Sequence, residues 1–216
     1  MARAAAGAGS WRSRWVMSEQ PSGNYYDKYH TRNPVARWLV EGFLRNFEDL
    51  ALLQPGRTAV EVGCGEGELS MRLARAGFQV SGHDIAPAAI AEARKRVAAA
   101  GLSIEFNVAA LATVANSVRA PLVVCCEVLE HLDDPEAGLD DLACMSESWL
   151  LVSVPREPLW RALNLCRGRY VGDFGNTPGH VNHWSSTSFL RFLERRFEVY
   201  SVRRPLPWTM ALCRRR

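Results

Sequence analysis

Three alternating glycines mark the first residues with a recognisable chemistry. Gly63, Gly65 and Gly67 lie in the run EVGCGEG, which starts at Glu61 and joins a strand-like segment to a helix-like one. Glycines at such a turn let the backbone approach a ligand, and a helix N-terminus offers N–H groups to an anion. Asp84 follows 17 residues after Gly67, at the end of the next strand-like segment. A carboxylate there can accept hydrogen bonds from the hydroxyls of a ribose.

The glycine spacing distinguishes two kinds of nucleotide site. The dinucleotide fingerprint is G-x-G-x-x-G, whereas residues 61–67 read E-x-G-x-G-x-G. The spacing therefore disfavours a nicotinamide-dependent dehydrogenase. Two structural alternatives stay open, because the glycines could form an ordinary strand–helix turn and Asp84 could cap the helix that follows it.

Histidines are the candidate proton acceptors. His131 follows the fourth strand-like segment, and His180 and His183 lie at the end of a glycine-rich loop. Histidine is the usual general base near neutral pH. We therefore expect His131 to act as the base or to position the substrate, and at least one of the other two to line the site. The alternatives are a helix-start hydrogen-bond network around His131 and simple bracing of the loop.

Arginines and aromatic residues gather after the fifth strand-like segment. They are Arg156, Trp160, Arg161, Arg167, Arg169 and Tyr170. An anionic group on a substrate, carboxylate or phosphate, would explain this cluster because arginine binds such groups with two parallel hydrogen bonds. A coding bias explains it nearly as well, since all but two of the 26 basic residues are arginine.

Strand-like and helix-like segments alternate from residue 56 onward. The expected strands are Thr58–Val62, Gln79–Asp84, Ser103–Val108, Pro121–Cys126, Trp149–Val154, Phe197–Arg203 and Trp208–Leu212. The expected helices between them are Glu68–Ala76, Pro87–Ala100, Leu111–Val118, Pro135–Ser146 and Ser186–Arg195. This alternation predicts parallel strands joined by right-handed crossovers, in an α/β doubly wound, Rossmann-like sheet closed by a hairpin.

The chain divides into three parts. Residues 1–16 contain three arginines and no acid, and they lack the apolar core of a signal peptide, so we expect a disordered extension. A transit peptide is the alternative, and Met17 is an alternative start. We expect residues 17–54 to form an N-terminal helical cap and residues 55–216 to form a single domain with a lid-like insertion at 156–184.

The glycine loop and Asp84 resemble those of class I S-adenosylmethionine-dependent methyltransferases, over residues 24–213. The run CCEVLEHLDDP from Cys125 to Pro135 and the Ser153–Pro155 strand end match the family's small-molecule branch. The sequence looks most similar to the ubiquinone-pathway O-methyltransferases, within the methyltransferase type 11–12 branch. The resemblance implies a seven-stranded, mostly parallel sheet with an antiparallel last strand. It also implies S-adenosylmethionine as cofactor, S-adenosylhomocysteine as product and no metal.

The resemblance further implies a set of residues that bind the cofactor. These are Tyr25, Glu61, Gly63, Cys64, Gly65, Gly67, Asp84, Ile85, Asn107 and Glu127. In such enzymes Asp84 would hold the ribose, Glu127 would contact the methionine part and Tyr25 would fold over the cofactor. Helix capping by Glu127 and core packing of the Tyr25 segment are the structural alternatives. The family often places an acid after the third strand for the adenine amino group, and here Asn107 or a backbone carbonyl takes that place.

The predicted function is methyl transfer to a small or lipid-like metabolite, preferentially at oxygen. Arg156, Trp160, Arg167, Arg169 and Tyr170 would bind the substrate, with an anionic group as their target. The missing acid after the third strand supports an alternative, a non-catalytic relative that keeps the cofactor and serves as a partner subunit. The acceptor and the oligomeric state stay open.

Charge and composition argue against other classes. The net charge of +3 is the sum of +3 over residues 1–16, −6 over 17–190 and +6 over 191–216. Because the body is acidic and no Asn-Pro-Pro-aromatic motif occurs, we do not expect a nucleic-acid substrate. No run of about 18 apolar residues is present, so no membrane-spanning helix is expected. Six cysteines without a C-x-x-C pair indicate reduced thiols and a cytoplasmic protein.

Overall fold

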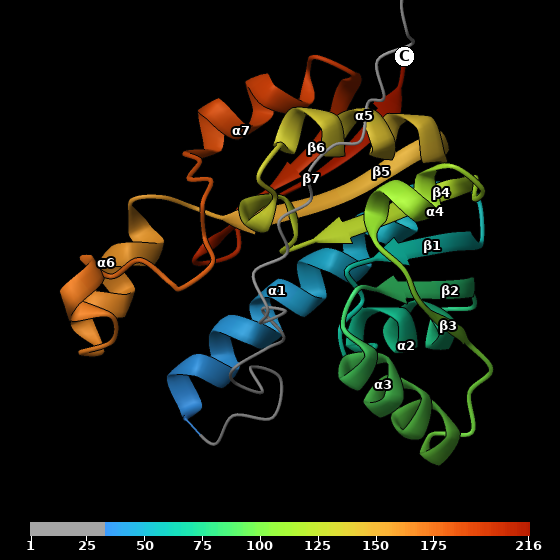
Figure 1. The fold of residues 1–216 in the computed structure, drawn as a ribbon, viewed down its shortest axis with the longest axis horizontal. Helices are drawn as coiled ribbons and strands as arrows, with labels where there is room; N and C mark the ends of the chain where they lie inside the picture. The colour runs from blue at the N-terminus through green and yellow to red at the C-terminus, as the bar shows by residue number, and fades with distance from the viewer. Residues whose placement is uncertain (1–32) are drawn as a thin grey trace, which may run out of the picture.

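The computed structural model describes residues 33–216, which alternate between strands and helices (Figure 1). The elements are α1 (Pro34–Leu52), β1 (Thr58–Val62), α2 (Glu68–Arg75), β2 (Gln79–Asp84), α3 (Pro87–Ala99), β3 (Glu105–Val108), α4 (Leu111–Ala115), β4 (Ala120–Cys126), η1 (Leu129–His131), α5 (Pro135–Met145), β5 (Ser146–Pro155), α6 (Leu159–Cys166), η2 (Val171–Asp173), α7 (Ser186–Leu193), β6 (Phe197–Arg203) and β7 (Trp208–Arg215). Tyr25 and the predicted extension at 1–16 lie outside the described residues.

The seven strands form one sheet in the order β3-β2-β1-β4-β5-β7-β6. β1 pairs in parallel with β2 and β4, and β7 is antiparallel to both β5 and β6. The chain moves outward from β1 to β3 and then returns to β4, so the direction of winding reverses between β1 and β4. This arrangement confirms the predicted α/β doubly wound, Rossmann-like sheet with an antiparallel last strand. Ligands of such sheets bind at the carboxyl ends of the strands beside this reversal.

Helices cover both faces of the sheet, and α1, α2 and α3 lie opposite α4, α5 and α7 (Figure 1). The alternation of strand side chains builds both cores. On β4, Leu122 and Val124 pack with α1 and α2, whereas Val123 and Cys125 pack with α5 and α7. Because helices cover both faces of the sheet, the central strands consist of continuous apolar runs.

Helix α1 starts at a strong sequence signal. The Asn33 side chain accepts hydrogen bonds from the N–H groups of Val35 and Ala36, and Pro34 occupies the first turn. Its apolar stripe, which includes Phe43 and Phe47, is buried against the sheet. One helix therefore occupies the described part of the segment predicted as a helical cap.

The largest difference from the predicted elements is α6, a helix inside the predicted lid-like insertion. Asn164 is the only buried residue of its eight, and the half-buried Trp160 connects α6 to the core. The predicted glycine-rich loop at 168–179 contains the short helix η2. Strand β5 starts before Trp149 because Ser146 pairs with Ala120 of β4, and β7 continues past Leu212 because its pairing with β5 and β6 reaches Arg214 and Arg215. Within residues 33–216, no helix is both long and apolar enough to cross a membrane.

Candidate active site

The glycine loop and the segment after β4 meet at the sheet reversal. Gly63 follows β1 with φ of 72°, a backbone conformation that favours glycine. A Cβ atom at Gly63 would overlap Cγ2 of Val128, which follows β4. A Cβ atom at Gly67, with φ of 80°, would lie 2.7 Å from the Phe106 ring. The two glycines therefore allow a close approach of backbone and side chains at this edge.

Asp84 ties the glycine loop to the end of β2. Its Oδ2 accepts a hydrogen bond from the Gly65 N–H at 2.8 Å, and its Oδ1 accepts one from the Ala86 N–H at 2.8 Å. The second bond forms a turn just before α3, whose N-cap residue is Ala86 and whose first turn receives no side-chain cap, so Asp84 does not cap this helix. A carboxylate has about four acceptor positions, so two of them remain for a ligand. The Asp84 side chain can therefore brace the loop and bind a ribose at the same time.

Glu61 and Cys64 lie behind the loop. Glu61 is only 2% exposed, and its Oε2 accepts a hydrogen bond from the Ser70 hydroxyl on α2 at 2.5 Å. The Cys64 side chain packs in a small core that includes Phe106. Burial, followed by the charges of Glu61 and Asp84, raises the pKa of the Cys64 thiol well above its usual range. Cys64 is therefore a neutral packing residue rather than a nucleophile.

Glu127 occupies the carboxyl end of β4 with φ of 60°, a conformation that a residue with a side chain rarely adopts. Its Oε1 accepts a hydrogen bond from the Ser153 hydroxyl at 3.1 Å, and its Oε2 accepts one from the Trp208 indole N–H at 2.6 Å. Sequence reasoning assigned Trp208 and the Ser153 hydroxyl no part in the site. The only signal was that both lie at strand ends, Ser153 on β5 and Trp208 on β7.

His131 and His180 come together from segments 49 positions apart. Their rings meet edge to face with centroids 4.9 Å apart, and the His180 ring stacks on Trp160 at 5.8 Å. His131 Nδ1 lies 2.9 Å from the Gly179 carbonyl oxygen. Because a carbonyl can only accept, this bond requires the proton on Nδ1 and leaves the lone pair of neutral His131 on Nε2.

Asn182 clasps the same two segments. Its side-chain amide donates to the carbonyls of Leu129 at 3.1 Å and Leu132 at 2.6 Å. The N–H groups of Val181 and Asn182 both donate to the Glu130 carbonyl, at 2.9 and 3.1 Å. His183 is exposed, and its Nε2 bonds to the side chain of Asn176 in its own loop. His180 therefore contacts His131, whereas His183 braces its own loop.

One group of described side chains could hold a metal ion. Ligand atoms of Glu130, His131 and His180 lie within 4.8 Å of one another. Imidazole and carboxylate together suit a transition-metal ion such as Zn²⁺. The sequence predicts no metal, and the candidate base His131 is one of these three residues.

Residues 59–145 match a protein family described as "Methyltransferase domain". The matched stretch runs from β1 to α5 and is less than half of the chain. The match confirms the resemblance to a methyltransferase that the glycine loop and Asp84 predicted.

Curated relatives of this chain have enzyme names. Over 127 residues the chain is 35% identical to a "Ubiquinone biosynthesis O-methyltransferase" of Idiomarina loihiensis. This match covers 58% of this chain and 48% of that protein. A protein of the same name from Xanthomonas euvesicatoria is 31% identical over 164 residues, with 74% of this chain and 64% of that protein covered. The chain thus spans about half to two thirds of the length of these two relatives.

Solved methyltransferase structures share the fold. The magnesium protoporphyrin IX methyltransferase of Synechocystis PCC 6803, crystallised with bound SAH (S-adenosylhomocysteine), has a TM-score of 0.68 at 24% identity, covering 88% of this chain and 91% of that one. An N-methyltransferase of Bradyrhizobium japonicum, also in complex with S-adenosylhomocysteine, has a TM-score of 0.65 at 19% identity, covering 85% and 89%. Both enzymes have the Rossmann-like fold described above.

The residues predicted for adenine and substrate binding are spread along the carboxyl edge of the sheet. Ile85 is half exposed next to Asp84, and the Asn107 amide donates to the Glu105 carboxylate at 2.9 Å. Arg156 ends up beside Trp184 through a backbone bridge.

Arg167, Arg169 and Tyr170 follow α6, an eight-residue helix that is about 12 Å long. Arg167 donates to the side chain of Asn164. Trp160 therefore lies against His180, and the arginines lie on both sides of α6 in the chain.

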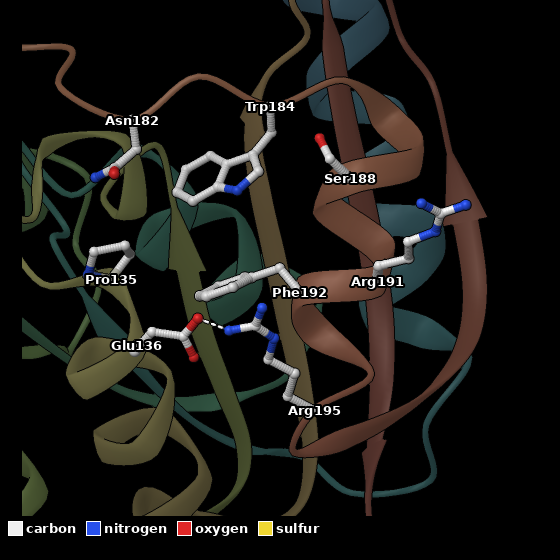
Figure 2. A pocket seen from close by; sticks show the side chains of 8 residues that line it. All are labelled: Pro135, Glu136, Asn182, Trp184, Ser188, Arg191, Phe192 and Arg195. Carbon is white, nitrogen blue, oxygen red and sulfur yellow. Dashed lines mark ion pairs between the residues drawn. The ribbon is translucent and has the colours of Figure 1, made fainter.

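A surface hollow of about 390 Å³ lies between α5 and α7 (Figure 2). Trp184 and Phe192 form its floor, with ring centroids 5.5 Å apart. Glu136 and Arg195 form an ion pair across it, and the Arg195 guanidinium also lies over the Phe192 ring. Its lining contains none of the glycine-loop residues, so it is separate from the predicted cofactor site.

Proposed function

We propose that this protein is an S-adenosylmethionine-dependent methyltransferase that methylates a small or lipid-like metabolite at oxygen. The observation that supports this most is the pairing of Asp84 with the Gly63–Gly67 loop at the sheet reversal, within a methyltransferase domain. Relatives named as O-methyltransferases support oxygen as the acceptor atom. Because these relatives are enzymes, a non-catalytic partner subunit is not favoured.

The residues fit the cofactor along the carboxyl edge. Gly63 and Gly67 have no side chain and adopt positive φ, so the loop can bring backbone atoms close to a ligand. In this proposal the free acceptor positions of Asp84 hold the ribose, and Ile85 and Asn107 lie beside the adenine. The Glu127 carboxylate attracts the cationic methionine end. When bound, S-adenosylmethionine supplies an electrophilic methyl group on a sulfonium ion, which leaves as a neutral thioether.

The acceptor hydroxyl must lose its proton as its oxygen bonds to the methyl carbon. His131 Nε2 takes this proton, since the Gly179 carbonyl holds the other ring proton on Nδ1. Trp160 and His180 stack beside this histidine and offer an aromatic wall to the acceptor. Positioning supplies most of the rate, because methyl transfer needs in-line geometry more than covalent help.

The proposal also covers the catalytic domain and its lid, the residues that bind the substrate and the location of the enzyme. Residues 55–216 act as the catalytic domain, and the insertion at 156–184 acts as a lid through which the substrate enters. Arg156, Arg167, Arg169 and Tyr170 bind an anionic group of the substrate at the lid. The enzyme works in the cytoplasm, a placement supported by six free cysteines.

Calorimetric titration with S-adenosylhomocysteine tests the cofactor site. We expect micromolar binding by the full chain and a loss of at least about tenfold in Asp84→Ala, the effect of removing a hydrogen-bonded charge. Asp140→Ala is the matched control, because Asp140 pairs with the exposed Arg196 on another face. No binding at millimolar ligand, or equal affinity in wild type and Asp84→Ala, would refute the proposal.

A further inference from the structure

We propose that Trp208 is a positioning residue that orients Glu127 toward the amino-acid end of the cofactor. This inference rests on the proposed function. Trp208 begins the antiparallel strand β7, which lies beyond the part of the chain that matches the methyltransferase family. The side chain nevertheless contacts the reversal point of the sheet, 81 residues away from Trp208 in sequence.

Both oxygens of Glu127 are fixed by neutral donors. The Trp208 indole N–H donates to Oε2 at 2.6 Å, and the Ser153 hydroxyl donates to Oε1 at 3.1 Å. Two donors on two oxygens set the plane of the carboxylate as well as its position. Hydrogen bonds of this kind also favour the charged form of a carboxylate. A carboxylate held in this way is prepared to receive a cationic ligand group without reorganisation.

The indole itself is held by packing. Trp208 is 5% exposed, and its ring lies edge-on to Phe43 of α1 at 5.0 Å and tilted against Trp160 of α6 at 5.7 Å. The backbone N–H of Trp208 donates to the Pro205 carbonyl at 2.6 Å. The direction of the indole N–H is therefore held by α1, by α6 and by the turn at Pro205.

The experiment compares two ligands that differ only in the part expected at Glu127. S-adenosylhomocysteine has the amino-acid end, whereas methylthioadenosine lacks it. In Trp208→Phe, which keeps an aromatic ring but removes the donor, we expect about a tenfold loss of S-adenosylhomocysteine affinity and methylthioadenosine affinity within about twofold of wild type. Ser153→Ala should give a smaller loss with the same ligand dependence, because its hydrogen bond is longer.

Two controls separate positioning from general damage. Trp149→Phe makes the same chemical change where the indole packs on Tyr200, away from the site, and should leave both affinities unchanged. In a Glu127→Ala background, Trp208→Phe should have no further effect, since its target is gone. Equal losses for both ligands, or no loss for either, would overturn the positioning role. A wild-type protein that binds neither ligand would instead refute the proposed function.

Discussion

Gly63→Ala tests whether the glycine loop is shaped by its contact with the segment after β4. The geometry predicts two separate losses of folding free energy in this variant. Alanine in the left-handed region costs about 1–2 kcal/mol relative to glycine, and φ at Gly63 is 72°. The new methyl group also overlaps Cγ2 of Val128, and overpacking of this kind costs about 1–3 kcal/mol. The expected destabilisation is therefore about 2–5 kcal/mol.

Gly77→Ala isolates the first cost. Gly77 has φ of 87° at the end of α2, but a Cβ atom there would meet nothing within 4 Å. Its substitution should cost about 1–2 kcal/mol, the conformational cost alone. Val128→Ala in the Gly63→Ala background removes the overlapping carbon, so the double variant should regain most of the difference between the two glycine variants.

Urea unfolding monitored by circular dichroism measures these free energies of unfolding. Calorimetry with S-adenosylhomocysteine on the same proteins should show weaker binding in Gly63→Ala and unchanged binding in Gly77→Ala. Equal destabilisation by the two glycine variants, or no recovery with Val128→Ala, would refute the crowding argument.

Three further predictions concern the histidine site and the thiols. His131→Gln should lower kcat about a hundredfold or more while S-adenosylhomocysteine affinity stays unchanged, and weaker cofactor binding would contradict a role as base. Asn182→Ala should release the clasp on η1, raising the acceptor KM and costing about 1–3 kcal/mol in urea unfolding, whereas an unchanged KM would argue against a link to the acceptor site. Burial raises the pKa of the Cys213 thiol to about 12, so an aromatic disulfide reagent at pH 8 should titrate only the exposed Cys144 and Cys166 until denaturant is added, and rapid reaction of more than two thiols would contradict the burial.

The sequence predicted most of the fold because its signals are local. Strand β1 and helix α2 follow from an apolar run, three glycines and a periodic segment, and their bounds differ from expectation by one residue at most. Helix α6 was missed because it lies between Pro158 and a glycine-rich stretch, where the sequence favours a loop. The early start of β5 and the late end of β7 were missed because strand ends are set by a pairing partner rather than by composition.

The predicted site residues divide in the same way. The roles of Asp84, Glu127 and His131 as ligand or proton partners stay predictions, but all three follow a strand or end one, as the alternation required. Arg156 lies before α6 and Arg167 after it, so their joint binding of an anion stays a prediction as well.

The sequence by itself determined the order of strands and helices along the chain, the glycine loop and the acid that faces it. Each of these depends on residues within one strand–helix unit. The tertiary structure alone decided that Trp208 and Ser153 hold Glu127 and that Gly179 sets the tautomer of His131. These partners are 26 to 81 residues apart. Local periodicity contains no information about such pairs, since they depend on how the closing strand and the lid pack against the reversal point of the sheet.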